Sequence, residues 1–149
     1  MIIKPARTVP GVVKRAFDAF RANDPIGVAE AYEIDAQLAT HLDPAIATAM
    51  KIGTIQGPVR ATCAIGILRF YAYQLSHFKV HDNEIVSATE RSKGIDVVSR
   101  WSVRSLETGE IYEGFNKNRW LLDRSGRRLI AGEGYCGLLA APAALVTNI

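Results

Sequence analysis

The sequence predicts a single α+β domain in which helices come first and a curved antiparallel sheet follows. Apolar residues recur at helical spacing near the start of the chain, and the spacing changes to two after Ser76. Turn-forming sequences then divide the second half into four segments of strand length. The 149 residues, taken as one domain over 1–149, are enough to bury a substantial core.

The first helix is predicted from an apolar stripe near the start of the chain. Val13, Ala16, Phe17 and Phe20 fall on one helical face. Thr8 can cap this helix, with a proline in its first turn.

A second, short helix is expected to begin after Asp24, with Pro25 in its first turn, and to run to about Tyr32. The other elements expected before Ser76 are a strand at 35–42, a turn or short helix at 43–56 and a helix at 57–75. Apolar residues cover most of the circumference of that last helix, so it is expected to pack against a sheet along most of its surface.

The four predicted strands are 77–90, 94–106, 111–122 and 128–137. If Thr108 and Gly109 form a two-residue hairpin turn, Val103 lies opposite Gly114 and the second and third strands divide into two faces. The charged face holds every charge from 95 to 120 outside the turn. The uncharged face comprises Val97, Ser99, Trp101, Val103, Tyr112, Gly114, Asn116, Asn118 and Trp120. Aromatic walls with a few amides are typical of a concave ligand pocket, although both tryptophans suit core packing equally well.

The register of the last strand depends on the length of the loop before it. A four-residue loop at 124–127, which we favour, adds Glu133 and Tyr135 to the uncharged face. A three-residue loop puts Gly132 and Gly134 there instead. The loop therefore decides whether the pocket contains a carboxylate.

Glu133 is the candidate catalytic residue if it faces inward. Burial in an apolar pocket raises the pKa of a carboxylate towards the range of a general base. Asn118, Tyr135 or Tyr71 would then hold it or bind a substrate carbonyl. Alternatively, Glu133 faces outward and pairs with an arginine such as Arg119.

Several function classes are not expected from composition and motifs. The net charge of +3 is spread over interspersed signs, so we expect no nucleic-acid partner. No apolar run reaches membrane-spanning length, and the start lacks the features of a signal peptide, so the expected location is cytoplasmic. Cys63 and Cys136 are expected to be buried thiols in a reducing compartment, and no metal site is predicted.

Residues 132–137 match the pattern G-x-G-x-x-G, but no βαβ unit follows them. Dinucleotide binding is therefore not expected. Glycines in a strand more often relieve crowding where the strand bends or contacts a neighbour.

Five short segments together resemble the ketosteroid isomerases and SnoaL-like polyketide cyclases of the nuclear-transport-factor-two-like superfamily. They are Val-Val-Lys-Arg at 12–15, Asn-Asp-Pro at 23–25, Ala-Tyr-Glu-Ile-Asp-Ala at 31–36, Leu-Arg-Phe-Tyr-Ala at 68–72 and Gly-Arg-Arg-Leu-Ile at 126–130. The resemblance covers roughly residues 9–137. It implies a cone in which helices pack on a strongly curved sheet with a concave pocket. It also implies homodimers formed through the sheet.

The isomerases' catalytic residues match this sequence only in part. Their general base falls on Thr40 and their oxyanion-hole tyrosine on Ala16. Their carboxylic-acid donor falls on Asn118, while the tyrosine of the third helix is present as Tyr71. The cyclases carry an acid on the last strand, in the region of Glu133.

The resemblance implies a protein that binds a small apolar molecule without a cofactor. One hypothesis is an acid–base isomerase, cyclase or dehydratase acting on a ring-shaped carbonyl substrate. The alternative is a non-catalytic ligand-binding or dimeric interaction module, and the sequence leaves open whether the protein is an enzyme. The candidate site comprises Glu133 as the catalytic residue, with Asn116, Asn118, Trp101, Trp120, Tyr135, Tyr71, Tyr32 and Phe70 as ligand-binding residues.

Overall fold

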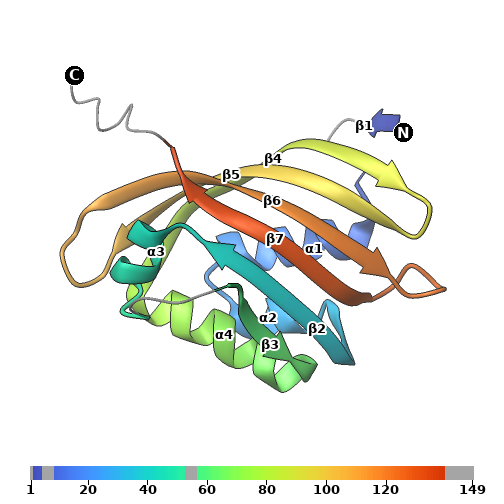
Figure 1. The fold of residues 1–149 in the computed structure, drawn as a ribbon, viewed down its shortest axis with the longest axis horizontal. Helices are drawn as coiled ribbons and strands as arrows, with labels where there is room; N and C mark the ends of the chain where they lie inside the picture. Colours follow the sequence, from blue (N-terminus) through green and yellow to red (C-terminus); the bar gives the residue numbers. More distant parts are fainter. Residues whose placement is uncertain (1, 5–8, 53–56, 140–149) are drawn as a thin grey trace.

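A computed structural model describes residues 2–4, 9–52 and 57–139, and it confirms the predicted α+β fold. The helices are α1 (Gly11–Arg21), α2 (Pro25–Ala29), α3 (Pro44–Ala49) and α4 (Cys63–His77). The strands are β1 (Ile2–Lys4), β2 (Tyr32–Leu42), β3 (Val59–Thr62), β4 (Phe78–Arg91), β5 (Gly94–Ser105), β6 (Ile111–Leu122) and β7 (Leu129–Leu138). Figure 1 shows one strongly curved sheet arching over α1, α2 and α4.

The sheet has the strand order β1-β4-β5-β6-β7-β2-β3. Strands β4 to β7 form the predicted antiparallel meander. Strand β2 pairs parallel with β7, which the sequence did not indicate, and β3 extends that edge. The pairing of β4 with β5 is interrupted by two irregularities, and such bulges increase the bend and twist of a sheet. The sheet therefore has a concave face, which the helices cover.

The two N-terminal helices follow the predicted patterns. Helix α1 buries Val13, Ala16 and Phe17, while the expected cap, Thr8, lies outside the described residues. The Asp24 side chain accepts a hydrogen bond from the Gly27 N–H at 3.0 Å, which caps α2 as predicted. Helix α2 ends at Ala29 and not near residue 32, because the chain enters β2 there.

The helix predicted at 57–75 is wrong at its beginning and in its burial. Residues 59–62 form β3 and pair with β2, since hydrogen bonding to an open sheet edge outweighs the local helical pattern. Helix α4 starts only at Cys63, whose side chain is exposed and not buried as expected. Within α4, Ile67 is fully buried, but Ile65 is 61% exposed. Helix α4 therefore packs on one side only.

The hairpin between β5 and β6 has a longer turn than predicted. The Ser105 N–H donates to the Glu110 carbonyl, which leaves a four-residue loop at 106–109. Val103 consequently lies opposite Tyr112 and not opposite Gly114. A slide of two residues leaves every side chain on its original face, so the predicted division into charged and uncharged faces is confirmed.

The hairpin between β6 and β7 has the four-residue loop that the sequence favours, at 124–127. The Asp123 N–H donates to the Arg128 carbonyl, and Leu122 lies opposite Leu129. The pairing next to the loop is therefore the predicted one.

Directly beyond this point β7 contains an extra residue, and the register changes. Leu121 lies opposite Ala131, so Ile130 forms a bulge. A one-residue slip turns each following side chain to the other face. The expectation that Glu133 and Tyr135 join the uncharged face is therefore wrong.

The glycines of β7 explain why this register is adopted. A Cβ atom at Gly132 would lie 2.7 Å from the Trp120 ring, and one at Gly134 would lie 1.9 Å from the Asn118 side-chain oxygen. Trp120 and Asn118 thus occupy the space that side chains at these glycines would need. This confirms that the glycines relieve crowding, as the sequence predicted.

We predict that Gly114→Ala destabilises the fold. Its Cβ atom would lie 2.2 Å from both the Gly137 carbonyl oxygen and the Trp101 ring, so the sheet would have to shift. Overpacking of this kind costs about 1–3 kcal/mol of unfolding free energy, measured by urea denaturation.

The matched control is Gly66→Ala in α4, where the nearest atom to the new Cβ lies 3.9 Å away. Alanine in a helix interior should raise the unfolding free energy by roughly 0.5–1 kcal/mol. Equal stability of the two variants would contradict the proposed packing at Gly114.

Candidate functional site

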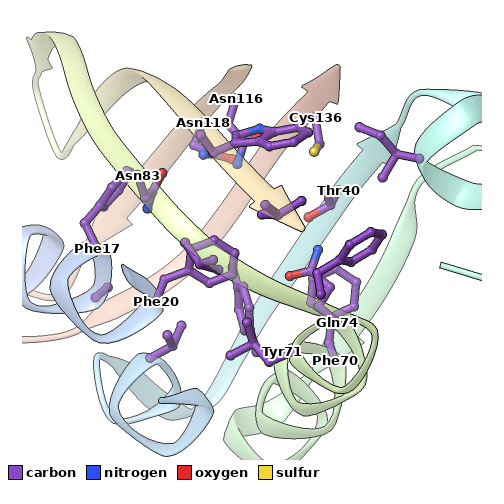
Figure 2. Close-up of a pocket in the computed structure, with 18 of the residues that line it drawn as sticks. Phe17, Phe20, Thr40, Phe70, Tyr71, Gln74, Asn83, Asn116, Asn118 and Cys136 are labelled. Atoms are coloured by element: carbon purple, nitrogen blue, oxygen red, sulfur yellow. The ribbon is translucent and has the colours of Figure 1, made fainter. Parts of the chain in front are cut away.

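A cavity of about 100 Å³ lies between the helices and the concave face of the sheet. Figure 2 shows side chains from both layers pointing into it. An engineered apolar cavity of ~150 Å³ holds one benzene molecule, so this cavity is on the scale of a single small ring. Its aromatic walls are formed by Phe17, Phe20, Tyr32, Phe70, Tyr71, Phe78, Trp101, Tyr112 and Trp120.

Most of the candidate ligand-binding residues line this cavity. They are Asn116, Asn118, Trp101, Trp120, Tyr71, Tyr32 and Phe70. Both tryptophans are more than nine-tenths buried, so they serve as core residues and as pocket walls together. The uncharged face of the sheet and the apolar stripe of α4 therefore meet here.

Glu133 and Tyr135 lie outside the cavity, on the convex face of the sheet. The Glu133 side chain is 70% exposed, and its carboxylate lies 4.0 Å from His41 Nε2. Tyr135 is 41% exposed and packs against Phe115, with ring centroids 5.9 Å apart. The bulge at Ile130 is the cause, since it reverses the facing of β7.

Glu133 belongs to a row of alternating charges that crosses the convex face. Arg91 Nε and Arg119 Nε lie 2.5 and 2.9 Å from the Asp96 carboxylate, and Arg119 lies opposite Glu133. Burial tends to raise the pKa of Asp96, but Arg119 and Arg91 outweigh it and lower that pKa. The outward, arginine-facing alternative for Glu133 is therefore the observed one.

Two hydrogen-bonded groups fix the walls of the cavity. The Trp101 indole N–H donates to the Asn116 side-chain oxygen at 3.0 Å. The Trp120 indole N–H donates to the Tyr32 hydroxyl at 3.1 Å, and Tyr32 also interacts with the Tyr71 hydroxyl. Burial raises the pKa of both tyrosines, so they are uncharged hydroxyl groups at neutral pH.

The cavity is also lined by five polar or weakly polar side chains that the site prediction did not include: Thr40, Gln74, Asn83, Tyr112 and Cys136. Gln74 follows Tyr71 by three residues and Phe70 by four, so helical spacing was the signal for it. Asn83 faces inward because the β4 register shifts between Val80 and Asp82, and no local sequence pattern indicates this shift. The resemblance to the isomerases did point to Thr40, because their general base falls at this position.

Among the described residues that line the cavity there is no aspartate, glutamate, histidine, lysine or arginine. Burial raises the pKa of the Cys136 thiol to about 12, so it too is uncharged. The described part of the chain also holds no cluster of side chains suited to a metal ion. The site can therefore surround a molecule with aromatic surface and neutral hydrogen-bonding groups.

Glu133→Gln tests whether this carboxylate contributes to the cavity. Because Glu133 is exposed, we expect the unfolding free energy to change by no more than ~0.5 kcal/mol. The affinity of the variant for small ring compounds that enter the cavity, measured by calorimetry, should equal that of the natural sequence. Loss of binding in a stably folded variant would contradict the outward position.

We predict that Tyr32→Phe lowers the unfolding free energy by about 1–3 kcal/mol. The change leaves the buried Trp120 N–H without its acceptor. The control is Tyr135→Phe, which removes the hydroxyl group of an exposed tyrosine and should be nearly neutral in the same urea titration. Similar losses in both variants would show that the buried hydrogen bond is not the cause.

No family model and no curated protein matches the sequence. Solved structures do match its fold. A protein of ketosteroid isomerase-like fold from Catenulispora acidiphila, in complex with trimethylamine, is 14% identical, with 86% of each chain covered and a TM-score of 0.67. A nuclear-transport-factor-two-like protein from Burkholderia pseudomallei is 16% identical, with 84% of this chain and 87% of that chain covered and a TM-score of 0.62.

A Mesorhizobium loti structure, described as that of a SnoaL-like polyketide cyclase, is 14% identical, with 86% of this chain and 98% of that chain covered and a TM-score of 0.58. These identities establish the likeness of fold and leave activity to the site itself. The chain thus has the α+β cone fold of the ketosteroid isomerase-like, SnoaL-like and nuclear-transport-factor-two-like proteins, as its sequence segments indicated.

Proposed function

We propose that this protein binds a small, uncharged and largely apolar molecule in the cavity, and that it does so without carboxylate catalysis. The observation that carries the proposal is the chemistry of the walls. The described residues that line the cavity combine many aromatic rings with polar groups that are all neutral.

The neutral walls favour an uncharged ligand. A buried ion loses its hydration, and no lining residue in the described ranges offers it an opposite charge. Aromatic faces instead provide a large apolar contact surface, and about 100 Å³ suits a single ring. The cavity therefore favours small aromatic or alicyclic molecules.

The absence of a carboxylate in the described cavity wall favours binding over acid–base catalysis. Thr40, at the position of the isomerases' base, has no charge to abstract a proton, and Glu133 is on the other face. Of the two functional hypotheses, the non-catalytic one is thus preferred.

Association of two copies through the sheet stays a prediction. The convex face carries the half-exposed side chains of Leu121, Ile130 and Tyr135, each about 40% exposed.

No helix in the described ranges has both the length and the apolarity to cross a membrane.

Replacing one of two alanines of α3 by leucine tests the binding proposal. Ala49 lines the cavity and Ala45 is exposed on the same helix. Ala49→Leu should fill part of the cavity and weaken binding of single-ring compounds at least tenfold, measured by calorimetry. Ala45→Leu should bind them as the natural sequence does. Equal affinity in both variants, or no binding of any small ring to the natural sequence, would refute the proposal.

Ligand affinity should be independent of pH between about 5 and 9. The pKa values of Tyr32 and Tyr71 are raised by burial and that of Cys136 is about 12, so these groups stay neutral throughout this range. A titration of affinity for an uncharged ring compound checks this. A step near pH 5–7 would indicate a carboxylate or histidine in the site.

A further inference from the structure

We propose that Gln74 selects the ligand, its side-chain oxygen accepting a hydrogen bond from an O–H or N–H group on the bound ring. This inference rests on the proposed binding function and narrows it. The ligand class becomes a single-ring molecule that carries a hydrogen-bond donor, with phenol as the simplest example.

The first observation is an unsatisfied acceptor. The Gln74 Oε1 atom is buried and has no hydrogen-bond partner among the residues that the structure describes. Buried polar atoms are nearly always paired, because an unpaired one loses its bonds to water without compensation. A ligand donor at this position would restore the missing hydrogen bond.

The second observation is where this atom lies. Gln74 lines the cavity from α4, on the helical face that also carries Phe70 and Tyr71. Figure 2 shows its amide directed towards the cavity interior, as is the Thr40 side chain from β2. The acceptor thus stands beside apolar walls that would hold the ring.

The chemistry of the group fixes the sense of the hydrogen bond. An amide oxygen can only accept, so the ligand must supply the hydrogen atom. A ring that bears a methyl group in place of a hydroxyl fits the same space but leaves Oε1 unpaired. Sites built to pair a ligand hydroxyl discriminate against the analogue that lacks it for this reason.

The test compares phenol with toluene, which have the same number of heavy atoms. Affinities are measured by calorimetry on the full chain, for the natural sequence and for Gln74→Met. We expect the preference for phenol, expressed as the ratio of the two dissociation constants, to fall about tenfold in Gln74→Met. The control is Gln37→Met, an exposed glutamine of β2, which should leave the ratio unchanged.

A second readout is the thermal stability of the ligand-free protein. Gln74→Met removes an unpaired buried oxygen and keeps the side-chain length, so its melting temperature should rise by a few degrees. A fall would show that Oε1 has a structural partner and would overturn the proposal. Gln74→Leu provides an independent second substitution with the same expectations.

The outcomes separate this inference from the proposed function. If phenol and toluene both bind and the ratio does not depend on Gln74, the selective role of Gln74 is wrong while the binding function stands. If neither binds the natural sequence, nor does any other small ring, the binding function itself fails and this inference fails with it.

Discussion

The packing of Trp120 against Gly132 is the contact on which the remaining structure depends. The Trp120 ring occupies the space that a side chain at Gly132 would need, which fixes the pairing of β6 with β7. Its N–H donates to Tyr32 of β2, and its ring packs edge-on against Phe17 of α1, with centroids 5.7 Å apart. One side chain thus joins the centre of the sheet, its parallel strand and the first helix.

Two irregularities in strand pairing decide which polar groups reach the cavity. The bulge at Ile130 turns Glu133 outward, and the shift between Val80 and Asp82 turns Asn83 inward. In each case a neutral residue faces the cavity where a charged residue would face it in a regular strand. The neutrality of the cavity is therefore a consequence of register, and the proposed ligand chemistry follows from it.

The separation of a charged convex face from an uncharged concave face explains how the sheet accommodates its charges. On the convex face, Arg91, Asp96, Arg119 and Glu133 alternate in sign across neighbouring strands, where water screens them. On the concave face, burial raises the pKa values of Tyr32 and Tyr71 further above neutral pH, so both hydroxyl groups stay protonated. A carboxylate moved from the first face to the second would lose its hydration without gaining a cation.

The sequence by itself determined the α+β class, the strand segments of the β4–β7 meander, the split of β5 and β6 into two faces and most of the aromatic wall. These features depend on local periodicity and turn chemistry, and a slide of two residues leaves them unchanged. Only the tertiary structure decided the parallel pairing of β2 with β7, the start of α4 and the facing of Glu133 and Asn83. The reason is physical: a one-residue bulge reverses a strand's facing at little local cost, and what favours it is the fit of Trp120 and Asn118 over glycines on a different strand.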